Sequence, residues 1–242
     1  VPDATYKVKR AITLAGHRAP IRATALSSDD SLLVTVGGQE IKFWNMKSHS
    51  CLRTLTMHPV TSNNNDEHDD VIVQDSIISC AFVPGNKAVL VGTKLGYVDL
   101  YEIASGLLLT REQLEPNTPV WGIDVAPNGQ SFATTAGKVV AFWNLEMVPV
   151  TADEEAYFSS VLASTIGQDS SKQLKRKRLT FEQTRALQLS DEVLCIKHSP
   201  DMKFFACGLL DSTARIFHYD SLNFYLSLYG HKLPILSLDI SD

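Results

Sequence analysis

The sequence predicts an all-β fold of the β-propeller type, and three observations support this prediction. First, an apolar residue followed by an aromatic one recurs four times at the end of a strand-like run. Second, the apolar runs are about four to six residues long, which is too short for helices. Third, Gly, Pro, Asp, Asn and Ser residues separate the runs at recurring positions, as they do in turns between short antiparallel strands.

The recurring pair gives the repeat its period. It stands at Phe43-Trp44, Leu100-Tyr101, Phe142-Trp143 and Ile216-Phe217, so the aromatic residues are 57, 42 and 74 positions apart. The middle spacing matches the roughly 40–45 residues of a WD40 blade. The other two spacings equal one blade plus an insertion, and we predict these insertions at 59–75 and 148–179.

Aligned strand by strand, the copies predict four blades of four short strands each. Strand-like segments at 10–14 and 235–240 flank them, and the second begins a further blade within 230–242. The fold class is therefore a WD40 β-propeller with four blades and flanking strands of an incomplete ring, taken as seven-bladed. Because an open ring would expose two sheet edges, we expect the chain to continue on both sides. The predicted blades are 16–57, 76–115, 118–190 with the insertion 148–179, and 192–229.

The histidine at the start of the first blade is predicted to be structural. WD40 blades join a His, a Ser or Thr, an Asp and the third-strand Trp in one hydrogen-bonded network. The first copy supplies His17, Thr35 and Trp44, with Gln39 or Glu40 near the position of the Asp. We therefore interpret this histidine as a capping group rather than as a ligand.

Net charge and the lengths of the apolar runs exclude some classes of protein. The formal net charge of −5 excludes a uniformly basic nucleic-acid binder, although a local basic patch remains compatible with it. No apolar run approaches the roughly 18–20 residues that span a bilayer, and no secretory signal is predicted.

The four cysteines are predicted to be free and structural. Cys51, Cys80, Cys195 and Cys207 are widely separated and form no Cys-x-x-Cys pair, which argues against a zinc site. Each lies in or beside an apolar run, where a free Cys behaves as a small hydrophobic residue. This usage fits a reducing compartment inside the cell.

The first insertion, 59–75, is acidic and rich in asparagine. His58, His68 and the neighbouring carboxylates suggest a metal site. Their low complexity and irregular spacing instead favour a solvated loop, and no metal site is predicted.

The second insertion contains a basic run, and three interpretations of it remain open. The run is a nuclear import element, a contact with RNA phosphates, or a solvated loop. A phosphate contact would add affinity without selecting an RNA sequence. The candidate residues are Lys172, Lys175, Arg176, Lys177 and Arg178.

No catalytic, cofactor-binding or metal-binding motif is recognised. The sequence has no Gly-x-Ser-x-Gly elbow, phosphate-binding Walker loop, Gly-x-Gly-x-x-Gly segment or His-Glu-x-x-His pair. The repeat already accounts for its Ser, His and Asp residues. We therefore expect no enzyme and no cofactor.

Several segments are also similar to one particular WD40 family. They resemble the UTP-twelve family, also called the WD repeat protein three or DIP-two family, over most of 10–242 apart from the insertions. The stretch Leu-Tyr-Gly-His-Lys-Leu-Pro at 228–234 is specific to this family rather than general to WD40 proteins. The other matching segments are 83–85, 91–96, 178–180, 183–189, 192–196, 199–200 and 209–217.

This resemblance implies a scaffold in the nucleolus of the cell nucleus. Members of the family are subunits of the UTP-B complex within the small-subunit processome. The implied partners are other UTP-B WD40 subunits, processome proteins and, at least indirectly, pre-rRNA and U3 small nucleolar RNA. The implied role is 18S rRNA maturation, with no membrane and no small-molecule substrate. The chain resembles part of the family's second propeller.

Two other classes of function provide alternatives. One is a nuclear WD40 adaptor of the ubiquitin-ligase or chromatin type, which reads peptides or recruits substrates. The other is a propeller enzyme. Co-purifying proteins and RNA distinguish the scaffold from the adaptor.

Overall fold

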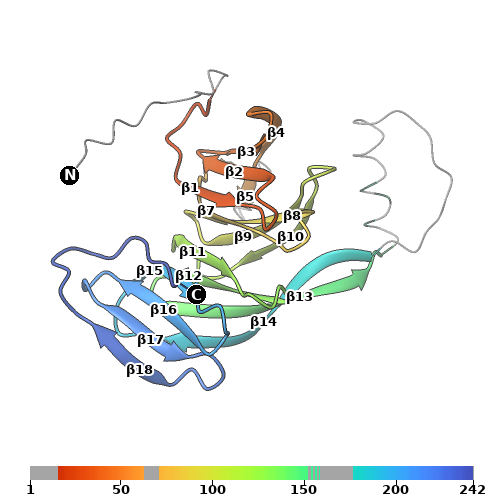
Figure 1. Cartoon of the computed structure of the whole chain (residues 1–242). Helices are drawn as coiled ribbons and strands as arrows, with labels where there is room; N and C mark the ends of the chain where they lie inside the picture. The colour runs from red at the N-terminus through yellow and green to blue at the C-terminus, as the bar shows by residue number, and fades with distance from the viewer. Residues whose placement is uncertain are drawn as a thin grey trace.

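The computed structural model describes residues 16–62, 71–151, 154, 156, 158 and 177–241. In these ranges the chain forms four four-stranded antiparallel sheets and one two-stranded hairpin (Figure 1). In each large sheet, strands that are consecutive in sequence are also neighbours in space. Such an up-and-down sheet is one propeller blade. The predicted fold class is therefore confirmed, and the ring of blades is not closed.

The first two blades lie on either side of the small hairpin in the sequence. Their strands are β1 (Ala23–Leu26), β2 (Leu32–Gly37), β3 (Glu40–Asn45) and β4 (Ser50–Thr56), then β7 (Ile77–Phe82), β8 (Ala88–Thr93), β9 (Tyr97–Glu102) and β10 (Leu108–Gln113). The hairpin between them consists of β5 (Val60–Ser62) and β6 (Val71–Val73). It forms the base of the predicted 59–75 insertion, of which residues 63–70, including His68, lie outside the described residues.

The third blade differs from the others in the length of its outer strands. β13 and β14 pair from Val139 opposite Gln188 to Pro149 opposite Lys177, with one shift of register between Phe142 and Trp143. We call the part of this pair beyond Asn144 and Glu182 the ribbon. The strands of blades three and four are β11 (Val120–Val125), β12 (Ser131–Ala136), β13 (Val139–Pro149) and β14 (Lys177–Gln188), then β15 (Val193–His198), β16 (Phe204–Leu209), β17 (Ala214–His218) and β18 (Phe224–Leu228).

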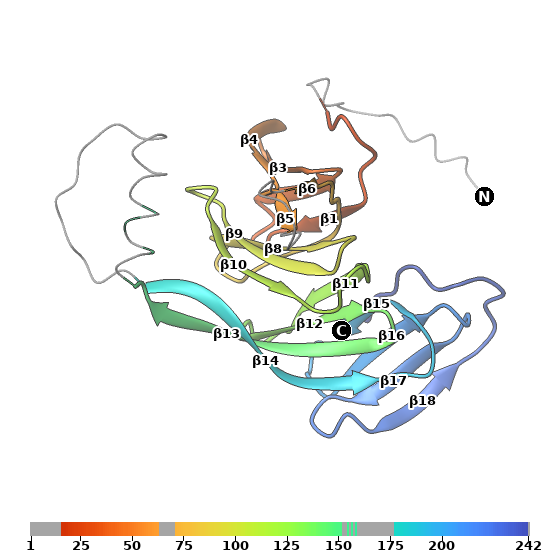
Figure 2. The same cartoon turned by 180° about the vertical axis from the view of Figure 1, so that it is seen from behind.

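The blades are arranged side by side around a common centre. Their innermost strands β1, β7, β11 and β15 contact one another in that order. Figures 1 and 2 show the sheets fanning outward from these strands, with the ribbon projecting from the rim of the third blade. Each blade therefore packs face to face on the next one.

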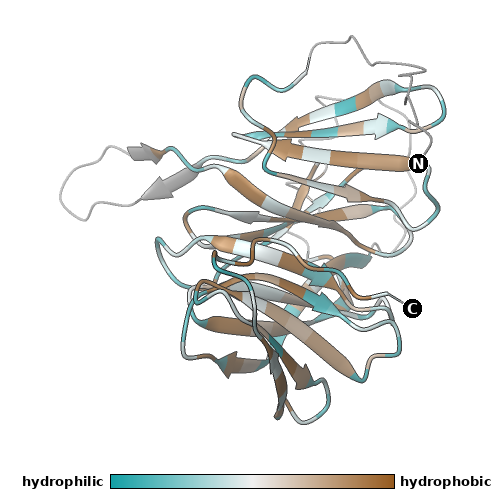
Figure 3. Ribbon diagram, turned by 60° about the vertical axis from the view of Figure 1, so that its left-hand side comes forward, coloured by the Kyte–Doolittle hydropathy of each residue, from teal (hydrophilic) through white to brown (hydrophobic). Residues whose placement is uncertain are grey.

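The hydrophobic core lies between the blades. One buried cluster joins blades one and two, a second joins blades two and three, and a third joins blades three and four. Every residue of the inner strands β8 and β12 is buried. A strand covered on both faces needs apolar or small residues throughout, which explains the apolar runs without alternation. Figure 3 shows the hydrophobic segments concentrated along the strands.

The predicted histidine network is present in the first blade. Trp44 Nε1 donates to Thr35 Oγ1 at 2.8 Å, and Thr35 Oγ1 lies 2.7 Å from His17 Nε2. His17 Nδ1 lies 3.6 Å from a carboxylate oxygen of Glu40, which stands in place of the usual Asp. Burial, followed by the nearby Lys42 charge, lowers the pKa of His17. The capping role predicted for His17 is confirmed.

The strand predicted at 235–240 is not formed. Ile235 is buried and its N–H donates to the Leu209 carbonyl at 3.2 Å, but no ladder of backbone bonds continues from it in the described part of the chain. A β-strand requires such a ladder. The segment therefore packs beside β15 without joining a sheet. The strand predicted at 10–14 lies outside the described residues.

The four cysteines are free, as predicted. Burial raises the pKa of the Cys80 thiol to about 12 and that of Cys195 to about 11. In the described ranges no helix has both the length and the apolar character needed to cross a membrane.

Candidate interaction face

One face of the blades carries most of the features that suggest binding. In an antiparallel sheet of four consecutive strands, the turns after the first and third strands lie at the same end. We call this end of the four blades the turn face. It contains the turns β1–β2, β3–β4, β7–β8, β9–β10, β11–β12, β15–β16 and β17–β18, together with the ribbon, which is the elongated β13–β14 connection.

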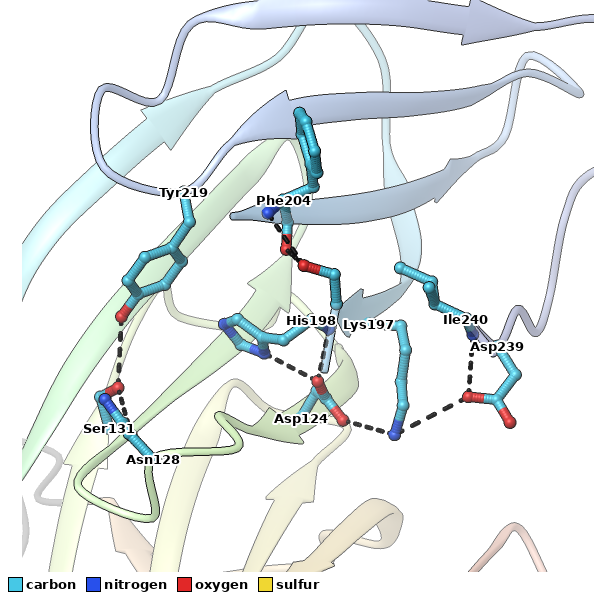
Figure 4. Close-up of polar contacts among 10 residues, drawn as sticks. Asp124, Asn128, Ser131, Lys197, His198, Phe204, Tyr219, Asp239 and Ile240 are labelled. Atoms are coloured by element: carbon cyan, nitrogen blue, oxygen red, sulfur yellow. Dashed lines mark hydrogen bonds and ion pairs between the residues drawn. The ribbon is translucent and has the colours of Figure 1, made fainter. Parts of the chain in front are cut away.

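A buried carboxylate joins the third and fourth blades close to this face. Asp124 of β11 accepts hydrogen bonds from the backbone N–H of His198 at 2.7 Å and from its Nδ1 at 2.7 Å (Figure 4). Lys197 Nζ donates to the other carboxylate oxygen at 3.0 Å. Lys197 Nζ also lies 4.0 Å from Asp239, in the segment after the fourth blade.

The Asp124 site is suited to holding blades together rather than to catalysis. The His198 side chain is 1% exposed, and its ring packs at right-angled or steeply tilted angles against Phe142 and Tyr219. A general base must reach a substrate proton within hydrogen-bond distance. A histidine enclosed by aromatic rings cannot do so, and we assign it a structural role.

The ionisation of Asp124 should affect stability at acid pH. Burial is the largest influence on its pKa and raises it, but the two His198 hydrogen bonds and the Lys197 charge together hold the pKa below its ordinary value of 3.8. A carboxyl with a lowered folded pKa stabilises the fold above its unfolded pKa and loses this contribution as the pH falls below it. We therefore expect the melting temperature of the full-length protein to fall below about pH 4.

Asp124→Asn tests this expectation, because it removes the charge and keeps the size of the side chain. We expect a lower melting temperature at pH 7 and a shallower acid dependence than in the unchanged protein, measured by circular dichroism. Asp220→Asn, at an exposed position, is the matched control. An acid dependence equally steep in Asp124→Asn would show that other groups cause it.

Two arginines link neighbouring blades in the same way. Arg53 lies opposite Phe43, and Arg185 opposite Phe142, so both hold the same place in their blades. Arg53 donates to the carbonyls of 103, 104 and 105 in the next blade, and Arg185 to those of 219 and 220. Between blades two and three the donor belongs to the later blade: Arg178 of blade three donates to the Leu109 carbonyl of blade two.

The structure separates the basic candidates into two kinds. Arg178 Nη1 donates to the Leu109 carbonyl at 2.8 Å and to Thr110 at 3.1 Å, and Nη2 lies 2.8 Å from Glu154. Lys177 is exposed and has no ion pair among the described residues. The guanidinium of Arg178 is thus used within the protein, whereas Lys177 faces solvent. Lys172, Lys175 and Arg176 lie outside the described residues.

A groove separates the ribbon from the second blade. Its volume is about 780 Å³, within the range of about 300–1,000 Å³ that is usual for ligand sites. We call it the ribbon groove. Its walls include Leu107 and Leu109 of blade two and Leu145, Met147 and Leu179 of the ribbon, with Phe158 beside them.

Helical residues lie beside this groove, within the segment predicted as an insertion without secondary structure. Thr151 N donates to Glu154 at 3.0 Å, and Glu154 N donates to Thr151 Oγ1 at 3.4 Å. This reciprocal pair is a capping box, which marks the start of a helix. Residues 154, 156 and 158 are helical. The spacing Thr-x-x-Glu at 151–154 is the pattern in the sequence that indicates this helix start.

A smaller hollow of about 380 Å³ lies nearer the centre of the ring. It is lined by the ends of β1, β7 and β11 and by Lys197. The β7–β8 turn residues Val83 and Pro84 line both this hollow and the ribbon groove. Among the described residues, no three His, Cys, Asp or Glu side chains are grouped to hold a metal ion. The turn face therefore offers surfaces for binding.

Comparison with known proteins places this chain in a family. The family described as the WDR3 second β-propeller domain matches residues 20–242. The human WD repeat-containing protein 3 is 36% identical over 225 residues, which cover 93% of this chain and 20% of that protein. The U3 small nucleolar RNA-associated protein 12 of Saccharomyces cerevisiae is 34% identical over 233 residues, covering 94% of this chain and 21% of that protein. The chain thus spans about a fifth of these relatives.

Proposed function

Because this chain belongs to the family of the WDR3 second β-propeller domain, we propose that it is part of a non-enzymatic scaffold for building the small ribosomal subunit. The observation that carries the proposal is its 34% identity, over 94% of its length, to a yeast protein named for association with U3 small nucleolar RNA. The protein would act in the nucleolus, as a subunit of the UTP-B complex within the small-subunit processome.

The architecture supports a scaffold. Blades that share buried clusters and are linked by Arg53, Arg185 and Asp124 form a stiff body with wide surfaces. The ribbon projects from this body, where it would be accessible to other molecules. The proposed partners are the other UTP-B WD40 proteins, with pre-rRNA and U3 RNA contacted at least indirectly.

Depletion of the full-length protein tests this proposal. We expect 18S rRNA to fall while 25S or 28S rRNA is maintained, as measured by pre-rRNA and mature rRNA profiles. The purified protein should carry U3 RNA and processome proteins. Unchanged 18S production would overturn the proposal. Co-purification with ubiquitin-ligase or chromatin subunits instead would favour the nuclear adaptor.

The basic run is proposed to contact RNA phosphates or to direct nuclear import. We expect Lys172, Lys175, Arg176 and Lys177 changed together to Ala to reduce RNA crosslinking or nuclear accumulation. If RNA is the ligand, affinity falls as salt rises, and a plot of log affinity against log salt has a negative slope. Each lost phosphate contact makes this slope shallower by about 0.7 for a single strand. Fluorescence imaging and crosslinking at several salt concentrations measure the two effects.

Arg178 is left unchanged in that variant because its guanidinium is bonded to the second blade. Arg178→Ala is the companion variant, and we expect it to loosen the ribbon, seen as faster hydrogen exchange in β13 and β14. Normal import together with unchanged crosslinks in the four-residue variant would leave the solvated loop as the explanation of the run.

A further inference from the structure

The ribbon groove has an apolar lining and is framed by elements that are already fixed in place. Thr110 Oγ1 of β10 donates to Thr180 Oγ1 of β14 at 3.1 Å, next to the two bonds from Arg178 to blade two. Glu154 holds the other side of the Arg178 guanidinium. A groove that is formed before its ligand arrives avoids part of the ordering cost of binding.

The charges around the groove are unbalanced toward positive. Glu102 is the carboxylate among the residues that line the groove, and it accepts a hydrogen bond from the Ser105 hydroxyl, which leaves its negative charge in place. Lys87 on the blade-two wall and Lys177 on the ribbon wall are exposed. Neither lysine has an ion pair among the described residues. With Lys87, Lys177 and Arg178 against Glu102, the residues that line the groove carry a net positive charge.

We propose that the ribbon groove binds a short segment of a partner protein that carries apolar side chains flanked by acidic residues. The apolar side chains would lie against the leucines and Met147, which is 56% exposed. Acidic residues on either side would reach Lys87 and Lys177. A segment of this kind fits the groove whichever assembly the protein serves.

The lining favours a peptide over RNA. Binding sites for single-stranded RNA combine a positive groove with exposed aromatic rings on which bases stack. Phe158 supplies the aromatic ring at this groove among the described residues, and it is only 9% exposed. The leucine side chains offer apolar contact but no face for stacking.

A pair of labelled peptides tests the proposal on the full-length protein. Both contain Leu-x-x-Phe, flanked by Glu residues in one and by Lys residues in the other, and fluorescence anisotropy measures their dissociation constants. We expect the acidic peptide to bind at least tenfold more tightly than the basic one. Lys87→Glu with Lys177→Glu should weaken the acidic peptide about five- to tenfold, the effect of two exposed charge contacts.

Lys94→Glu is the matched control, because Lys94 is an exposed lysine of the same blade at the opposite end. It should leave binding unchanged. Met147→Glu should weaken the acidic peptide, because it places a negative charge on the apolar wall and close to the Glu residues of that peptide. These substitutions fall on exposed side chains, and unchanged circular dichroism spectra would show that the fold is retained.

Three results would overturn the proposal. Equal affinity for the two peptides would remove the charge argument. Affinity unchanged by the Lys87 and Lys177 reversals would place binding elsewhere. A labelled single-stranded RNA that binds in a reversal-sensitive way and displaces the acidic peptide would assign the groove to RNA. Each of these results is independent of the 18S rRNA measurement.

Discussion

Replacing Arg111 with Ala is expected to reduce the free energy of unfolding of the second blade by about 3–5 kcal/mol, the usual cost of leaving one partner of a buried ion pair alone. Asp99, its partner, is completely buried. Arg111 Nε and Nη2 donate to the two carboxylate oxygens at 2.8 and 2.7 Å. Tyr101 also donates to Asp99, at 3.2 Å. Without the guanidinium, the carboxylate would remain buried with one neutral donor.

The same arginine also holds the chain that leads into the β5–β6 hairpin. Arg111 Nη2 donates to the His58 carbonyl at 3.1 Å, and Nη1 donates to that of Pro59 at 3.3 Å. We therefore expect the variant to show faster hydrogen exchange in β9, β10 and β5 of the full-length protein. Exchange measures the free energy of such local opening.

The double variant Arg111→Leu with Asp99→Leu separates the ion pair from the packing. Replacing both charges with apolar groups is often neutral. Its exchange rates should lie closer to those of the unchanged protein than the rates of Arg111→Ala do. Arg215→Ala breaks an ion pair with Asp211, whose side chain is 29% exposed where that of Asp99 is 0% exposed, and it should cost less than about 1 kcal/mol. Equal losses in Arg111→Ala and Arg215→Ala would contradict the argument.

Phe142→Ala is expected to cost about 3–5 kcal/mol as well, because it removes a large buried ring and leaves a cavity. The ring is 2% exposed and lies in the cluster between blades three and four. It contacts Phe205, with centroids 5.2 Å apart, and Tyr219 at 6.0 Å. The Arg185 guanidinium lies 5.2 Å from its centroid.

The loss should spread across the contact between the two blades. We expect faster exchange in β13 of blade three and in β15 and β16 of blade four. Phe224→Ala is the control, because that ring is 56% exposed and its loss should change stability by no more than about 0.5 kcal/mol. A change confined to blade three would show that the blades open independently of each other.

Local patterns account for the parts of the fold that the sequence predicted correctly. The Phe-Trp and Leu-Tyr pairs mark the third strand of each blade, and the turns at 83–87 and 126–130 connect the first two strands. The pairing of His17 with Thr35 and Trp44 also followed from the repeat. These features depend on residues within one blade, where strand spacing and turn chemistry act over short distances.

Local patterns were misleading in two places. The run 235–240 has the alternation of a strand but lacks the backbone partner that a strand needs. The ribbon, by contrast, continues β13 and β14 to Pro149 and Lys177, because the two segments pair with each other outside the blade. Strand length depends on the available partner as well as on propensity.

The sequence by itself determined the blade repeat, the order of the strands and the absence of a recognisable catalytic motif. Only the tertiary structure showed that Arg178 is bonded to Leu109 and Thr110, 68 or more positions away, and that Lys177 is left exposed beside a groove. The reason is physical. The blade repeat follows from regular spacing along the chain, whereas the groove and its free charges follow from how neighbouring blades pack and how far each side chain reaches.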